Sequence, residues 1–265
     1  MFKDLFDLRG ALSGRASLTL TAIGLAIIVC FWQIAYMMHF ANESLLPSPL
    51  SVVSGFGELW FKDFLFENML YSLKLNFLGY IEAILFSIPV GLTLGLIPAV
   101  RGLFQKFFDA IRFVPIPAIT GLIITLFGLG DNMKIQFLAI GIIVYLIPTT
   151  IQRVDEVSDV FLDTVRTLGA TKWQMLRYVY IPSVLSQSIK DIQVLTAISW
   201  TYITVAEVIN KTNGLGALAS SAARMSQNNK VIAIMVIITL IGVLQDRIFN
   251  KLSVALFPWK YGNLH

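Results

Sequence analysis

The chain has 265 residues, of which 56% are hydrophobic and only 14% are charged. A soluble globular domain is about 45–50% apolar and about 25% charged, because a water-facing surface needs charged side chains. The composition therefore argues against a soluble enzyme, a disordered chain and a nucleic-acid-binding domain, and it predicts an all-α membrane protein. The formal net charge of +4 does not change this, since the Lys and Arg residues flank apolar runs and do not cluster.

Cysteine and histidine are too rare for a disulfide framework or a metal site. The chain has one cysteine, Cys30, inside an apolar run, and two histidines, His39 and His265, far apart in sequence. No catalytic motif and no pair of carboxylates on one helix accompanies them. We therefore expect neither a metal ion nor a catalytic residue in this chain.

Six apolar runs are long enough for transmembrane helices. A helix needs about 20 mostly apolar residues to cross a hydrocarbon core about 30 Å thick, and its backbone polar groups must be satisfied internally. We expect one transmembrane domain over residues 1–265. The expected spans are 17–38, 75–97, 113–129, 135–151, 192–209 and 231–249.

The first run has a second interpretation, as a signal peptide, because Lys3, Arg9 and Arg15 precede it. It is longer than the apolar region of such peptides, and no clear small-residue cleavage site follows it before Asn42. We therefore expect it to be retained as an anchor.

Lys and Arg residues concentrate in the N-terminal tail, the loop between the second and third spans, the segment 151–183 and the C-terminal tail. Cytoplasmic loops carry an excess of these residues. The distribution predicts that both termini and the segment 151–183 lie in the cytoplasm.

The segment 155–182 is the one sizeable polar element on that side. Apolar residues recur in it at helical spacing and predict an amphipathic helix over 156–168. Gly169 would end this helix as the glycine just beyond its C-terminus.

A second short helix is predicted directly after Gly169. Thr171 and Gln174 have the spacing of a capping box, which begins helices, and Pro182 is expected to end the helix. The apolar side chains at the turn either pack against the ends of the spans or dock into a groove on a partner protein, and their spacing favours neither. These side chains belong to Leu168, Ala170, Trp173 and Leu176.

The same segment carries a recognisable pattern. Asp163-Thr164-Val165, then Gly169, then Val179-Tyr180-Ile181-Pro182 resemble the EAA signature of ABC-importer permeases, which reads Glu-Ala-Ala, three residues, Gly, nine residues and Ile-x-Leu-Pro. The sequence departs from it at Asp163, at the two Ala positions and at Ile181. It keeps the central Gly and the closing Pro.

Further short motifs, spread over roughly residues 45–260, resemble the nitrate/sulfonate/taurine/bicarbonate branch of these permeases. They are Leu45-Leu46-Pro47-Ser48-Pro49, Ile88-Pro89-Val90-Gly91-Leu92, Phe127-Gly128-Leu129-Gly130-Asp131, Ala206-Glu207 with Gly214-Leu215-Gly216, and Phe257-Pro258-Trp259.

The resemblance implies a type I importer permease in the bacterial inner (plasma) membrane. It implies pairing with a second permease chain, expected to be an identical copy, and a periplasmic or lipid-anchored binding protein that delivers a small solute, expected to be an anion such as nitrate, bicarbonate or an organosulfonate. Separate cytoplasmic ABC ATPase subunits would bind ATP and Mg²⁺. The chain has no Gly-Lys dipeptide and hence no Walker A loop, so ATP hydrolysis must come from another chain.

The resemblance also implies that the turn sits in a groove on the ATPase as a coupling helix, around Arg166 to Leu176. The candidate coupling residues are Asp163, Arg166, Leu168, Gly169, Ala170, Thr171, Trp173, Leu176 and Pro182.

Polar residues inside the spans are candidates for the translocation pathway, because ionisable groups are costly there. Glu82 is one, although it could instead pair with Lys74. Arg112, at the start of the third span, is expected to extend its charge to the membrane surface. The threonines of the fifth span either line a polar passage or bond between helices. The candidate pathway residues are Glu82, Trp200, Thr201, Tyr202, Thr204 and Glu207.

A secondary transporter and an intramembrane enzyme are the two alternative functions. A secondary transporter driven by an ion gradient would need inverted repeats with broken helices, and no such repeat is visible. An intramembrane enzyme would need a nucleophile with its base, or metal ligands, within the spans, and neither histidine is well placed for this.

Overall fold

The computed structural model describes residues 12–42 and 45–261, and within these ranges all regular structure is helical. This confirms the all-α prediction. The contacts divide the chain into two compact units, 1–63 with 221–234 and 64–220 with 235–265. The prediction of a single domain stays a prediction.

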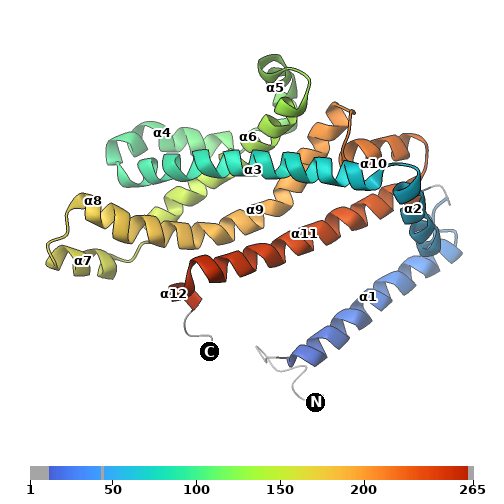
Figure 1. Cartoon of the computed structure of the whole chain (residues 1–265), viewed down its shortest axis with the longest axis horizontal. Coiled ribbons are helices and arrows are strands. Elements are labelled where there is room, and N and C mark those ends of the chain that lie inside the picture. The colour runs from blue at the N-terminus through green and yellow to red at the C-terminus, as the bar shows by residue number, and fades with distance from the viewer. Residues whose placement is uncertain (1–11, 43–44, 262–265) are drawn as a thin grey trace. The chain divides into compact units, whose positions relative to one another are not determined.

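Figure 1 labels the helices in chain order. In the described ranges, five helical runs are long and apolar enough to cross a bilayer. They are α1 (Gly14–Met37), α3 (Leu65–Leu96), α6 (Asp131–Asp155), the run Lys172–Ile209 that ends in α9 (Ile181–Ile209), and α11 (Asn228–Leu256). The other helices are α2 (Pro49–Phe61), α4 (Pro98–Ile111), the 3₁₀ turn η2 (Ile116–Ile119), α5 (Thr120–Phe127), α7 (Asp159–Thr167), α8 (Lys172–Met175), α10 (Leu215–Arg224) and α12 (Pro258–Tyr261).

The predicted third span, 113–129, is wrong as a continuous helix. Pro115 and Pro117 interrupt the backbone, so η2 and then α5 follow α4 at a bend of 97°. Proline has no N–H to donate and restricts the residue before it, which prevents an α-helix from continuing through both positions. With eight residues, α5 is about 12 Å long and cannot cross a bilayer alone. The described chain has a sixth candidate span only if Pro98–Ile111 and Ile116–Phe127, which meet at this bend, are counted together as one span.

The sequence predicted that Pro182 ends the second short helix, and this prediction is wrong. Helix α8 continues through a π-helical turn, Leu176–Tyr180, into α9, and Pro182 lies in the first turn of α9. A π turn shifts the backbone register, which accommodates the ring and the missing donor of proline. An unbroken helical run therefore connects the turn at Gly169 to a membrane span.

Close packing of α3 against α6 forms the centre of the larger unit. A Cβ atom at Gly91 would lie 2.5 Å from Cβ of Thr150, and one at Gly95 would lie 2.8 Å from Val154. These glycines therefore allow two helices to approach closely, as small residues do in membrane proteins.

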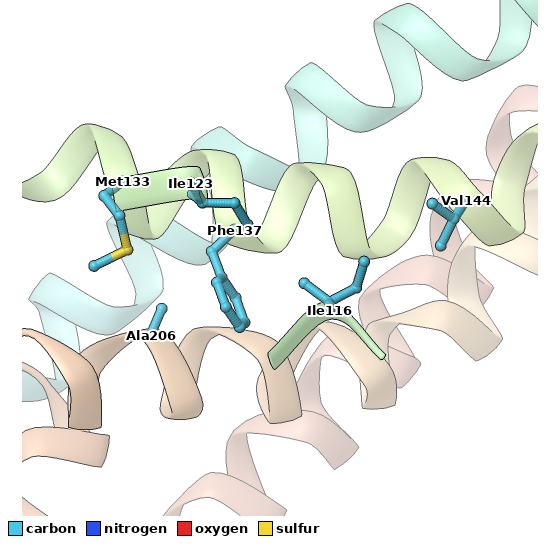
Figure 2. Close-up of a cluster of buried hydrophobic side chains, with 6 residues drawn as sticks. All are labelled: Ile116, Ile123, Met133, Phe137, Val144 and Ala206. Carbon is cyan, nitrogen blue, oxygen red and sulfur yellow. The ribbon is translucent and has the colours of Figure 1, made fainter. Parts of the chain in front are cut away.

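A buried cluster holds the short α5 to the bundle. Figure 2 shows Phe137 of α6 directed toward α9, with Ile116 of η2 and Ala206 of α9 around it. Burial of apolar side chains here compensates for the broken helix before α5. The cluster consists of Ile116, Ile123, Met133, Phe137, Val144 and Ala206.

In the smaller unit, α1 has no buried residue, so its apolar side chains are available to lipid. Nε1 of Trp32 donates a hydrogen bond to the backbone oxygen of Pro47, 3.0 Å away, which joins α1 to the start of α2. Lys230 forms ion pairs with Asp63 at 2.7 Å and with Glu58 at 3.2 Å.

Candidate functional site

The turn between α7 and α8 is built by local backbone chemistry. The N–H of Gly169 donates to the oxygen of Arg166 at 2.9 Å, and the N–H of Ala170 donates to the oxygen of Val165 at 3.0 Å. This is the Schellman pattern, and it places Gly169 at φ +78°, where glycine carries no steric penalty. The predicted helix end at Gly169 is confirmed.

The capping box at the start of α8 is also confirmed. The backbone N–H of Gln174 donates to Oγ1 of Thr171 at 3.3 Å, and the N–H of Thr171 donates to Oε1 of Gln174 at 2.7 Å. The pair satisfies donors that the end of a helix leaves unpaired. We call the segment 159–180 the elbow, and Figure 1 shows α7 and α8 meeting there beside the junction of α3 and α4.

The elbow buries one face and exposes another. Leu162 and Val179 pack with Val154, Val157 and Val184 of the bundle. This contact holds the base of the elbow in place, so part of its apolar surface packs against the spans.

The outer face of the elbow carries an apolar patch that nothing in the described chain covers. Leu168 is 81% exposed and Trp173 is 65% exposed, on either side of Gly169. A cluster of exposed large apolar side chains marks a surface that contacts a partner protein or lipid. The elbow patch comprises Val160, Phe161, Leu168, Trp173 and Tyr178.

The remaining candidate coupling residues surround this patch. Asp163 and Arg166 are exposed and form an ion pair with each other at 2.9 Å. Ala170 and Leu176 are half-buried. The role of the whole set in coupling stays a prediction.

An apolar cavity of about 530 Å³ separates the elbow from the end of α3. Leu92 and Leu96 line it from α3, and Met175 and Tyr180 line it from the elbow side. The same four side chains also pack against the cluster that contains Val154 and Val184, so the cavity lies beside the packed base of the elbow.

Two bidentate ion pairs brace the bundle at the elbow end. Arg153 of α6 binds Asp191 of α9 through Nε and Nη2, at 2.8 and 2.7 Å. Arg101 of α4 binds Asp155 of α6 with both contacts at 2.7 Å. Paired hydrogen bonds of this kind are stronger and more directional than single ones. The sequence reasoning counted these arginines only as markers of orientation.

At the opposite end, Glu207 lies in a closed polar cluster. It is 1% exposed and accepts hydrogen bonds from Oγ of Ser72 at 2.6 Å and from the N–H of Gly216 at 2.8 Å. Ser72 in turn accepts from the N–H of Leu215 at 2.8 Å. A carboxylate at the N-terminus of α10 satisfies free donors and complements the helix dipole.

Lys134, which the sequence reasoning did not select, lies beside this cluster and is fully buried. Its Nζ donates to the hydroxyl oxygens of Tyr71 at 3.1 Å and Thr212 at 3.0 Å, and to the backbone oxygen of Asn213 at 3.3 Å. It thereby fixes the loop between α9 and α10. A lysine directly before the fourth apolar run was the available signal.

The structure does not bring the six candidate pathway residues together. Glu82 is exposed on α3 and accepts a hydrogen bond from Gln136 at 2.7 Å, while Glu207 lies in the closed cluster. Trp200 is buried and donates to Gln245 of α11 at 2.6 Å.

The other three lie together on α9. Tyr202 packs edge-on against Phe137. Thr204 donates to the backbone of its own helix, and Thr201 is exposed. Trp200, Thr201 and Thr204 line an open cavity of about 370 Å³. Their role in a pathway stays a prediction.

The chain is similar to a known protein family and to permeases of known name. The profile of the family described as "binding-protein-dependent transport system inner membrane component" matches residues 87–255. The chain is 28% identical to the taurine transport system permease protein TauC of Escherichia coli, covering 91% of this chain and 90% of that protein. It is 26% identical to the putative aliphatic sulfonates transport permease protein SsuC of Bacillus subtilis, covering 89% and 85%.

A chain of the solved inward-facing MetNI methionine ABC transporter superposes with a TM-score of 0.66 at 16% identity, covering 75% of this chain and 97% of that one. A chain of a solved amino acid ABC transporter gives a TM-score of 0.56 at 20% identity, covering 77% and 97%. These likenesses confirm the predicted fold.

Proposed function

We propose that this chain moves a small organosulfonate across the membrane, driven by ATP hydrolysis in separate ABC ATPase subunits. The chain belongs to the family of binding-protein-dependent transport system inner membrane components. The chain is thus a permease of an ABC importer and not an enzyme. The printed names of two similar permeases, for taurine and for aliphatic sulfonates, support the organosulfonate.

The elbow patch is the observation that carries the coupling part of this proposal. Its apolar side chains stand on a hydrogen-bonded turn, outside the buried core of the bundle, and are exposed for docking into a groove. A cytoplasmic ATPase subunit is the proposed occupant. ATP and Mg²⁺ would be bound by that partner, and movement of its groove would reach α9 through the continuous helix.

The proposal also sets the orientation and the assembly. The elbow, both termini and the ion pairs of Arg153 and Arg101 face the cytoplasm, in agreement with the distribution of Lys and Arg. The end that holds Glu207 faces outward, where a periplasmic or lipid-anchored binding protein delivers the solute. A second identical permease chain completes the pathway.

Two tryptophans of equal exposure allow a matched test. Trp173 on the elbow is 65% exposed and Trp259 on α12 is 64% exposed. We expect Trp173→Glu to abolish co-purification of the ATPase and ATP-driven taurine uptake into vesicles, and Trp259→Glu to leave ATPase association intact. Gly169→Asp should behave like Trp173→Glu, because it disrupts the turn.

Retention of the ATPase by both elbow variants would contradict the docking role. Uptake by the wild-type complex that proceeds without ATP would contradict the importer itself.

A further inference from the structure

A polar cavity of about 220 Å³ lies between α4 and the elbow-proximal half of α6. It differs from the apolar cavities of the larger unit in being lined by charged, amide and hydroxyl groups. Arg112, Gln152 and Asp155 are exposed, so the cavity opens to the surface of the bundle and is accessible to a polar ligand. The lining residues are Gln105, Asp109, Arg112, Pro148, Thr149, Ile151, Gln152 and Asp155.

The sequence spacing explains how these groups meet. Gln105, Asp109 and Arg112 follow one another at intervals of four and three residues, which places them on one face of α4 and its C-terminal cap. Thr149 and Gln152 are three residues apart and share a face of α6. Packing of α4 against α6 brings the two polar faces to the same cavity.

Two opposite charges in this cavity are not paired with each other. Asp155 is neutralised by its bidentate contact with Arg101. Asp109 and Arg112 are one helical turn apart, yet among residues 12–42 and 45–261 neither forms an ion pair. The guanidinium of Arg112 lies over the ring of Phe113, 5.2 Å from its centroid. The cavity therefore presents one available cation and one available anion.

The uncharged polar side chains of the cavity divide into hydrogen-bond donors and acceptors. Oε1 of Gln105 accepts from Nε of Arg101 at 2.7 Å, so the amide nitrogen of Gln105 is left to donate. The hydroxyl of Thr149 donates to the backbone of Tyr145 at 2.6 Å, so its oxygen is left to accept. Nε2 of Gln152 donates to Glu156 at 2.9 Å, which leaves its amide oxygen to accept.

We propose that this cavity is a contact site for the transported solute and that it selects a small zwitterionic aminosulfonate, such as taurine, over a simple sulfonate anion. Arg112 and the amide of Gln105 would bind the sulfonate oxygens. Asp109, with the oxygens of Thr149 and Gln152, would bind the ammonium group. The inference deepens the proposed function and rests on it, because it concerns the solute of the same permease.

The charge balance supports the zwitterion. In and beside the cavity the two positive charges of Arg101 and Arg112 equal the two negative charges of Asp155 and Asp109, so a simple anion would find no excess positive charge there. A solute with both charges would pair with both free groups. Arg112, expected from the sequence to extend its charge to the membrane surface, is exposed and also lines this cavity.

The test uses the complex of permease and ATPase in lipid nanodiscs without the binding protein, so that selection by the binding protein does not enter. Binding of taurine, ethanesulfonate and β-alanine is measured by saturation-transfer NMR. We expect taurine to bind most tightly. Arg112→Gln should weaken binding of taurine and ethanesulfonate by roughly tenfold or more, because a charge-assisted bond is lost.

Asp109→Asn should remove only the preference for taurine, so that taurine and ethanesulfonate bind alike. Lys106→Gln is the control, because Lys106 is exposed on the same helix and does not line the cavity. We expect it to bind all three probes as the wild type does.

Equal binding of taurine and ethanesulfonate by the wild-type complex overturns the inference, even where a variant fails to fold. Unchanged taurine binding and ATP-driven taurine uptake in Arg112→Gln also overturns it, and leaves the proposed function standing. Failure of the proposed function looks different: the wild-type complex with its binding protein would import no sulfonate under ATP.

Discussion

Glu207, at the end of α9, accepts a hydrogen bond from the backbone N–H of Gly216, 2.8 Å away in the first turn of α10. The carboxylate thus joins a membrane span to the short helix that follows it. Because Ser72 of α3 donates to the same carboxylate, three segments of the chain depend on one buried side chain.

Removal of Glu207 should destabilise the bundle. Glu207→Ala leaves buried donors of Ser72 and Gly216 without acceptors, at a cost of about 1–3 kcal/mol each. We expect a lower free energy of unfolding for the detergent-purified permease, measured by chemical or thermal denaturation. Glu82→Gln is the control, since Glu82 is exposed and has one side-chain partner. Equal stability of both variants would contradict the capping role.

A side chain at position 91 should push α3 away from α6. A Cβ atom there would lie 2.5 Å from Thr150, which is closer than folded proteins allow, so Gly91→Ala is expected to cost roughly 1–3 kcal/mol. Gly102→Ala on α4 meets no atom within 4 Å and should be neutral or slightly stabilising. A comparison of the two unfolding midpoints tests this, and a stable Gly91→Ala variant would show that the helices can separate freely.

The ion pair of Arg153 and Asp191 should contribute to the stability of the protein through direct contact between the two side chains. Arg153→Ala leaves the partly buried Asp191 without its partner, and Asp191→Ala leaves Arg153 with Glu156 alone, so both changes should destabilise the protein. In a double-mutant cycle we expect a coupling energy of about 1–3 kcal/mol, because the pair is bidentate. Additive effects of the two single changes would contradict this expectation. The exposed pair of Asp163 and Arg166 serves as the control, with an expected coupling of about 0.2–1 kcal/mol.

Deletion of one residue from the π turn should misalign the elbow. Removal of Tyr178 converts the π turn to α-helix, and the ring of Pro182 would then clash with the backbone oxygen four residues before it, which kinks the helix between the elbow and the span. We expect the bundle to fold, while ATP-driven uptake in vesicles is lost. Tyr178→Ala keeps the length of the turn and should retain most of the uptake. Full transport by the deletion variant would rule out a fixed alignment between elbow and span.

Local features of the sequence predicted local features of the structure. The apolar runs predicted the long spanning helices, because the length of a hydrocarbon core and the need to satisfy backbone groups act within each run. Gly169 predicted the end of α7, and Thr171 with Gln174 predicted the start of α8, because these effects operate over three to five neighbouring residues. The turn at Gly169 could therefore be derived without any knowledge of its surroundings.

Other features were decided by contacts between distant parts of the chain. Pro182 was expected to end a helix, but the π turn before it let the helix continue into α9. Lys134 looked like a flanking charge, and its partners Tyr71 and Thr212 are known only once α3 and the loop after α9 are in place.

The sequence by itself determined that this chain is a bundle of membrane helices with a polar elbow, because hydrophobicity and helix capping are properties of short segments. Only the tertiary structure decided that Glu207 caps α10 and that Asp109 and Arg112 face the same cavity as Thr149. Ser72 and Glu207 are 135 residues apart in sequence. No periodicity over a few turns carries information about such a pair, since its geometry depends on how whole helices pack.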